Sequence, residues 1–144
     1  MAAFGKINLE LWDCSGEFSG EKNWPAIQKD ADGVMFVYDP AQPNHEDILT
    51  QLVQLFPRAM GLQPKFCMCY VNHHNTSGGI LPSHNVPKCM AGLEKHIGSA
   101  EDNQGIFQGF EKYLIKLLTL LADKQRLQEE DLIWAAFNTT EVIW

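Results

Sequence analysis

Two short apolar runs, each closed by a polar turn, constrain the fold of this chain more than any other feature. The first covers residues 33–38 and ends at Asp39-Pro40, and the second covers residues 66–71 and ends at Asn72. Runs of this length without polar alternation are typical of parallel strands that are buried on both faces. Residues 7–11 instead alternate apolar and polar side chains, which predicts a strand with one buried face.

Helical patterns alternate with these strands. Residues 23–31 predict a short helix with Pro25 in its first turn. Asn44 is the expected N-cap of a second helix, which Pro57 or Gly61 should end. The strongest apolar stripe comes late in the chain, at Phe107, Phe110, Leu114, Leu117, Leu118 and Leu121. This order predicts an α/β fold with a mostly parallel sheet, whose binding loops follow the carboxyl ends of the strands.

Charge and length exclude several function classes. The chain has 144 residues, enough for a single domain, and a net charge of −7. An acidic chain without clustered Lys and Arg is not expected to bind nucleic acid or an anionic membrane face. No apolar run approaches the roughly 20 residues that span a bilayer, and neither end carries a secretory or prenylation signal. We therefore expect a soluble intracellular protein with no membrane anchor.

Three loop motifs carry the candidate chemistry. Asp13 and Gly16 form an Asp-x-x-Gly sequence after the first predicted strand, and Asn72-His73-His74-Asn75 ends the last apolar run. Ser99-Ala100-Glu101 precedes the final helix. Their order and spacing resemble the Asp-x-x-Gly, Asn-Lys-x-Asp and Ser-Ala-Lys loops of small GTPases.

At family level the chain resembles Rab-like protein 5, the small-GTPase-like subunit of intraflagellar transport complex B. The resemblance runs from about residue 9 to residue 113 and is carried by residues 9–16, 24–26 and 30–34. It implies a Rab-like, three-layer P-loop NTPase fold that is incomplete here, because the phosphate-loop strand and helix are lacking. It divides the chain into a partial small-GTPase-like domain, 1–122, and a tail, 123–144.

The same resemblance implies a function, partners and a site. A member of this family is a protein-interaction component in cilium assembly, held by coiled-coil subunits of the transport complex. Its location is the cytoplasm, the cilium or flagellum and the ciliary base. GTP or GDP with Mg²⁺ is the implied ligand. Asp13 would serve Mg²⁺ and Gly16 the γ-phosphate, and the base would be held by Asn72, Asn75, Ser99 and Ala100.

Four departures argue against a working GTPase. No G-x-x-x-x-G-K-[ST] sequence is present, so the main cradle for the phosphates is missing. Glu17 stands where hydrolysing relatives usually carry Gln, and His73 replaces the Lys of the guanine loop. Asn75 replaces the Asp that accepts two hydrogen bonds from guanine, and an amide has only one acceptor oxygen. The favoured hypothesis is a non-enzymatic subunit without catalytic residues. The alternative is a GTP/GDP switch whose phosphate-binding N-terminus is missing from this chain.

The missing strand has a consequence for folding. In the small-GTPase sheet it lies between the Asp-x-x-Gly strand and the next one, so its loss should leave unpaired backbone groups on both sides. We therefore expect this chain alone to be poorly folded or associated, and a sharp monomeric two-state melt would count against that expectation.

Two further hypotheses concern cysteines and the tail. Cys67 and Cys69, with His73 and His74, lack the spacing of a zinc site and are better explained as small core residues and strand-end histidines. In the tail, Trp134 and Phe137 are either part of an extra packed element or anchors for a partner. The sequence does not decide between those two.

Overall fold

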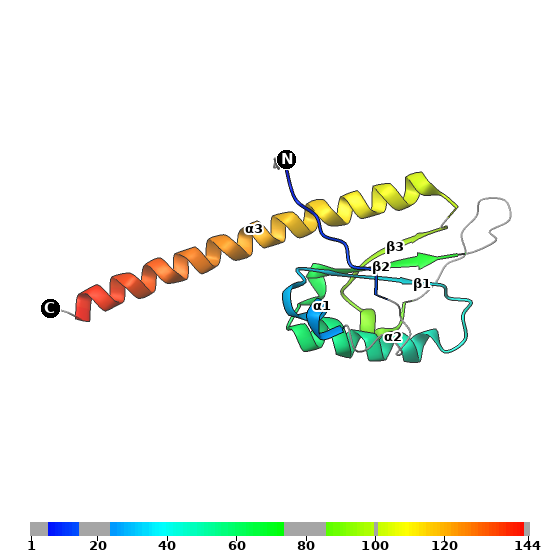
Figure 1. Cartoon of the computed structure of the whole chain (residues 1–144), viewed down its shortest axis with the longest axis horizontal. Coiled ribbons are helices and arrows are strands. Elements are labelled where there is room, and N and C mark those ends of the chain that lie inside the picture. The colour runs from blue at the N-terminus through cyan, green and yellow to red at the C-terminus, as the bar shows by residue number, and fades with distance from the viewer. Residues whose placement is uncertain (1–5, 15–23, 74–85, 100, 143–144) are drawn as a thin grey trace.

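The computed structural model describes residues 6–14, 24–73, 86–99 and 101–142, apart from the side chains of residues 26, 27 and 136–142. Its helices are α1 (Trp24–Asp30), α2 (His45–Val53) and α3 (Asn103–Val142), and its strands are β1 (Val34–Tyr38), β2 (Cys67–Asn72) and β3 (Glu94–Gly98). A π-helical turn, Gln54–Arg58, and two 3-10 turns, Pro64–Phe66 and Lys88–Met90, complete the described elements. Figure 1 shows the helices and strands along the chain.

The strands form a parallel sheet in the order β1-β2-β3. Val34 of β1 lies opposite Cys67 of β2, and Met68 of β2 lies opposite Glu94 of β3. The predicted α/β class with a parallel sheet is confirmed.

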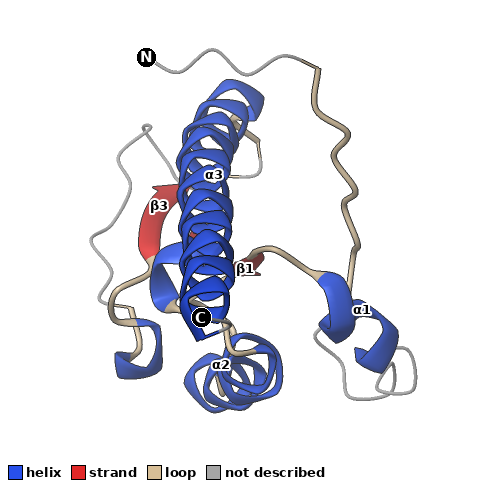
Figure 2. Cartoon of the chain, turned by 90° about the vertical axis from the view of Figure 1, so that its left-hand side faces the viewer, coloured by secondary structure: helices blue, strands red, loops and turns tan. Residues whose placement is uncertain are grey.

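Helices cover the sheet on both sides, as Figure 2 shows, so the fold has the three layers that were predicted. One core lies between the sheet and α2 and consists of Phe36, Tyr38, Leu49, Val53, Cys69, Val71 and Met90. The other lies between the sheet and α3 and consists of Phe66, Met68, Tyr70, Tyr113 and Leu117. Tyr113 ties α3 to the sheet, because its hydroxyl donates a 2.7 Å hydrogen bond to the carbonyl of Phe66.

The two predicted buried strands differ in burial. β2 is buried from Cys67 to Val71, which confirms Cys67 and Cys69 as core residues. In β1, Phe36 and Tyr38 are buried, but Met35 is 42% exposed and Val37 is 58% exposed. The prediction for β1 is therefore wrong on one face, because α3 packs over Met68 and Tyr70 of β2 and leaves that face of β1 uncovered.

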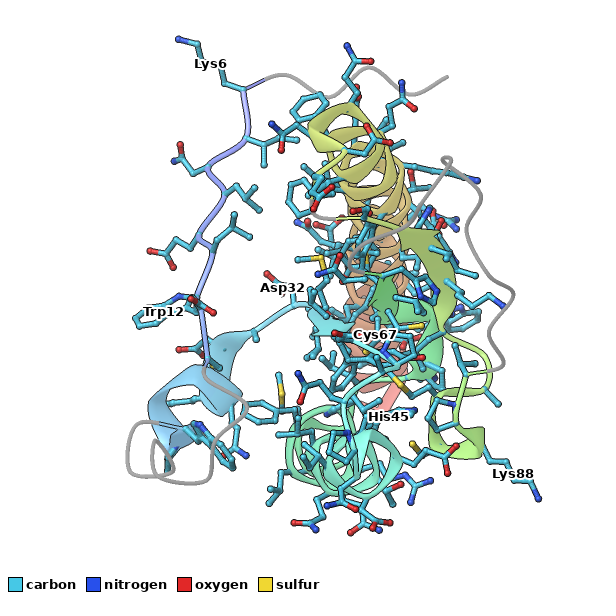
Figure 3. The ribbon with its side chains drawn as sticks, turned by 90° about the vertical axis from the view of Figure 1, so that its right-hand side faces the viewer. Lys6, Trp12, Asp32, His45, Cys67 and Lys88 are labelled. Atoms are coloured by element: carbon cyan, nitrogen blue, oxygen red, sulfur yellow. The ribbon has the colours of Figure 1, made fainter. Side chains whose placement is uncertain are left out.

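The prediction of a strand at residues 7–11 is wrong. Residues 6–14 are extended but belong to no strand. Ile7, Leu9 and Leu11 are exposed, as is Trp12, which Figure 3 shows directed away from the domain. A strand needs a neighbour for its backbone hydrogen bonds, and the described residues offer this segment none.

The second helix begins where it was predicted and ends differently. Asn44 is the N-cap, but its φ of 64° is left-handed and its side chain makes no capping hydrogen bond. Asn tolerates this conformation better than most residues. The helix continues past Val53 into the π-helical turn that contains Pro57, which has no N–H for the regular ladder. It ends at Gly61, whose φ of 71° suits glycine.

The last helix is longer than its apolar stripe predicted. α3 runs for 40 residues without a break, so residues 123–142 continue the helix that starts on the sheet. Figure 1 shows its second half extending far beyond the sheet. The domain boundary at residue 122 stays a prediction. Within the described residues, no helix combines the length and apolarity that crossing a membrane requires.

Candidate functional site

The carboxyl edge of the sheet brings two of the predicted site residues together. Asn72 is the last residue of β2 and lies opposite Gly98, directly before Ser99. The N–H of His73 donates a 2.8 Å hydrogen bond to the carbonyl of Gly98, which ties the two loops together. Ser99 is buried, and its Oγ accepts a hydrogen bond from the N–H of Glu101 at 3.3 Å. The loops that hold Asn72 and Ser99 therefore lie side by side at the carboxyl edge of the sheet.

Of the other predicted residues, the structure describes Asp13 alone, and Asp13 does not join this pair. Asp13 is exposed and ends the extended segment outside the sheet, so it does not stand at the end of a strand beside Asn72. Gly16, Asn75 and Ala100 lie outside the described residues. The described part of the edge thus offers an amide and a serine hydroxyl, but no carboxylate from Asp13 for Mg²⁺ and no phosphate cradle. These residues do not fit GTP with Mg²⁺.

A hollow of about 420 Å³ adjoins Ser99, between β3 and the first turns of α3. Three glycines line it, at positions 98, 105 and 109, together with polar side chains from both elements. A Cβ at Gly98 would collide with the hydroxyl of Tyr70. A Cβ at Gly109 would stand 3.3 Å from the ring of His96. Because Gly109 has no side chain, the ring of His96 fits closely against α3.

His96 is the main residue that sequence reasoning missed. Its side chain is only 18% exposed, and its Nε2 lies 3.3 Å from a carboxylate oxygen of Glu94, which is 13% exposed. Two residues apart on one strand, they point to the same face of the sheet. The sequence signal for the packing of His96 against α3 was the pair Gly105 and Gly109. Small residues four apart share one helix face and let another element pack closely against it.

Tyr70 lines the hollow and keeps its hydroxyl proton at neutral pH. Burial raises the pKa of Tyr70, and the nearby charge of Asp102 raises it further. Asp102 also accepts a 3.1 Å hydrogen bond from the N–H of Gly105, so its carboxylate caps the start of α3. The polar groups here can therefore donate hydrogen bonds to a small molecule and accept hydrogen bonds from it.

The cysteines of β2 are not placed for chemistry. Burial raises the pKa of Cys67 and of Cys69 to about 11, so both are thiols at neutral pH. Within the described residues, no group of three or more His, Cys, Asp or Glu side chains could hold a metal ion.

Curated proteins similar to this chain share one name. The intraflagellar transport protein 22 homolog of Danio rerio is 32% identical over 130 residues, which are 88% of this chain and 68% of that protein. The chain belongs to the intraflagellar transport protein 22 family. The Homo sapiens homolog is 30% identical over 122 residues, and the Chlamydomonas reinhardtii protein is 29% identical over 76 residues.

Membership of this family confirms the resemblance to Rab-like protein 5 that residues 9–34 carry. The chain spans about two thirds of the length of its vertebrate relatives, 66% of the human one. No protein-family model matches the chain. No solved structure matches it either.

Proposed function

We propose that this chain is a protein-interaction subunit of the intraflagellar transport machinery, in complex B, and acts in cilium assembly. The proposal is supported by relatives in vertebrates and in a green alga that bear the name of an intraflagellar transport protein. His73 and Asn75 stand in place of the Lys and Asp of the guanine loop, which argues against nucleotide chemistry and in favour of a role in assembly.

The observation that carries an interaction role is the second half of α3. The last α3 side chains in the core on this face of the sheet are Leu120 and Leu121. One turn later the ammonium group of Lys124 lies 5.9 Å from the centre of the Phe66 ring. Beyond that point, among the side chains that the structure describes, Leu127, Leu132, Ile133 and Trp134 are large, apolar and exposed. Most of the stability of a helix in a protein comes from packing of its apolar side chains, so a partner that covers these residues would stabilise this half of α3.

The partner that fits this surface is another helix, as in a coiled-coil subunit of the same complex. Leu120, Leu127 and Trp134 are spaced by seven, the repeat that brings apolar residues onto one seam of paired helices. Trp134 is 62% exposed and is the expected anchor. Phe137 lies on the same helix, and its role as a second anchor stays a prediction.

The test is association with purified complex B subunits. Leu127→Asp with Trp134→Asp should abolish association, because charges would enter the apolar seam. Gln125→Asp is the matched control, since this exposed residue lies on another side of the helix and hydrogen-bonds to Glu129 at 3.3 Å. Full association of the double variant, with α-helical content intact by circular dichroism, would remove α3 as the interaction surface.

We also propose that the chain does not act as a GTP/GDP switch. Titration with fluorescent GTP and GDP in the presence of Mg²⁺ should give no saturable binding at micromolar nucleotide. Micromolar or tighter affinity that depends on Mg²⁺ would instead support the switch, with Asp13, Asn72 and Ser99 as the first residues to substitute.

A further inference from the structure

The seam of α3 contains charged residues as well as apolar ones. Alternate steps of three and four residues along it give Leu117, Leu120, Lys124, Leu127, Asp131 and Trp134. Residues at this spacing lie on the side of a helix that faces a paired helix. Leu117 and Leu120 pack against the sheet, and the ammonium group of Lys124 lies over the Phe66 ring. The seam therefore faces the sheet in the first half of α3, and Figure 1 shows that the second half extends beyond the sheet.

Two cationic side chains lie where the seam leaves the sheet. The ammonium groups of Lys65 and Lys124 are 5.6 Å and 5.9 Å from the centre of the Phe66 ring. Both side chains are exposed, and neither forms an ion pair with a carboxylate of the described residues. Asp123 precedes Lys124 in the chain but projects about 100° away from it around the helix. This end of the seam is therefore locally positive, on a chain whose net charge is −7.

The sign of the charge then reverses along α3. After Arg126, the next charged residues are Glu129, Glu130 and Asp131, which are all acidic and exposed. Glu130 lies 3.4 Å from the guanidinium group of Arg126, and Glu129 accepts a hydrogen bond from Gln125. Among the described residues, the carboxylate of Asp131 has neither an ion pair nor a hydrogen bond of this kind. The seam thus presents cations near the sheet and an anion one heptad further along.

We propose that the subunit bound to the second half of α3 supplies a helix of complementary charge, acidic opposite Lys65 and Lys124 and basic opposite Asp131. This inference rests on the function proposed above and adds the chemistry of the partner. A charged residue in the seam of paired helices costs stability unless the facing side chain compensates it, so such residues select the partner and the register. A helix with suitable apolar residues but like charges at these positions would be rejected.

A second copy of this chain does not meet the requirement. In a parallel pair each seam residue faces its own counterpart, so Lys124 would meet Lys124 and Asp131 would meet Asp131. An antiparallel pair could bring Lys124 opposite Asp131, but residues 135–142 of each helix would then lie alongside residues 113–120 of the other. The seam packs on the sheet there, through Leu117. Because the sheet occupies that side of α3, another helix cannot pair along it, and the partner is a different chain.

Charge reversal in the full chain tests the proposal through its affinity for purified coiled-coil subunits of complex B. Lys65→Glu with Lys124→Glu should weaken that affinity by about tenfold or more, because like charges would then face each other. Lys29→Glu with Lys88→Glu is the matched control, since both residues are exposed and the net charge changes equally. Figure 3 shows Lys88 directed away from the domain. At about 150 mM salt the control should change the affinity less than about twofold, because charges more than about 8 Å apart are largely screened.

Asp131 is tested in the same assay. Asp131→Lys should weaken the affinity by about fivefold or more, because the basic side chain of the partner would then meet a cation. Glu111→Lys is its matched control, since it makes the same change of charge at an exposed position on the first half of α3. Circular dichroism of every variant should show the α-helical content of the unsubstituted chain.

Crosslinking supplies a measure that does not depend on the folding of a variant. A zero-length carbodiimide joins an amine to a carboxylate where the two are in contact, with loss of water. Mass spectrometry of the unsubstituted complex should therefore find Lys65 or Lys124 joined to an Asp or Glu of the partner. Absence of any such crosslink overturns the proposal, as does an affinity that Lys65→Glu with Lys124→Glu lowers no more than its control.

The oligomeric state and the apolar seam separate this proposal from the one on which it rests. The chain alone should be a monomer in sedimentation velocity, and a dimer that Leu127→Asp breaks would overturn the proposal in favour of a second copy. Loss of association in Leu127→Asp with Trp134→Asp, together with insensitivity to charge reversal, would overturn the charge requirement and leave the proposed function standing. Full association of that apolar variant would remove both.

Discussion

β1 and β2 arise from similar apolar runs, yet the two strands differ in their neighbours and in how far they are buried. β2 is the central strand, has a strand on each side and packs against both α2 and α3. Among the described strands β1 has one neighbour, and its Met35 and Val37 point to a face that none of the described helices covers. The contrast between two methionines is the clearest, because Met68 of β2 is fully buried and Met35, its register partner in β1, is 42% exposed.

The difference teaches that composition sets how apolar a strand is, whereas its neighbours decide how much of that surface is buried. The uncovered face of β1 lies on the side where the small-GTPase fold was expected to be incomplete. Each prediction below compares the well-covered part of the sheet with the uncovered part.

The largest effect is expected from truncating the buried methionine. Met68→Ala should lower the free energy of unfolding by about 2–5 kcal/mol, because it removes fully buried surface and leaves a cavity. Met35→Ala, its matched control, should cost less than about 1 kcal/mol, since much of that side chain is already in water. Urea denaturation followed by circular dichroism measures both. Equal costs would mean that a partner or a second copy covers β1 in solution.

A smaller effect is expected where α3 reaches over the amino ends of both strands. Tyr113→Phe removes the hydrogen bond to the carbonyl of Phe66 and should cost about 0.5–1.5 kcal/mol of stability. The ring is retained, so the measured change reports on the hydrogen bond. Thr119→Val is the control, because its hydroxyl bonds to the carbonyl of Ile115 on an exposed part of α3. A Tyr113→Phe variant as stable as the unsubstituted chain would show that α3 is not held there.

A further effect is expected from raising the pH above 9. Burial raises the pKa of Cys67 and Cys69 from 9.0 to about 11, so the folded chain keeps protons that the unfolded chain loses. Stability should be full below pH 9 and should decline as the pH rises from 9 towards 11. Burial raises the pKa of Tyr38 and Tyr113 too, in the same direction. Melting temperatures from pH 8 to 10 should therefore fall less steeply in Cys67→Ala with Cys69→Ala, and an unchanged slope would contradict the assignment to these thiols.

Much of the described fold could be predicted from the sequence, because the relevant signals are local. Pro25 and the acidic residues after Asn44 predict helix starts, and the two apolar runs predict parallel strands. Residues 7–11 carry an equally good local pattern, yet they form no strand in the structure. Alternation specifies which side chains share a face, but it does not supply the neighbouring strand that the backbone needs.

The candidate site was predictable only in part. Asn72 and Ser99 follow strands that pair side by side, so their proximity follows from the rule on carboxyl edges. β3 was ambiguous because Glu94, Lys95 and His96 give it little apolar character. The hollow beside Ser99 depends on how closely α3 packs on β3, at Gly109 and His96. Contacts between residues this far apart in the sequence are hard to predict from local patterns.

The unbroken course of α3 has a mechanical consequence. From residue 123 to residue 142 the helix adds about 30 Å of reach at 1.5 Å per residue. A stiff arm of that length acts as a lever, and a tilt of about 10° at its base moves its tip by roughly 5 Å. Small adjustments where Tyr113 and Leu117 pack on the sheet would therefore be magnified at Trp134. A partner bound at Trp134 would be displaced whenever the packing of α3 on the sheet changes.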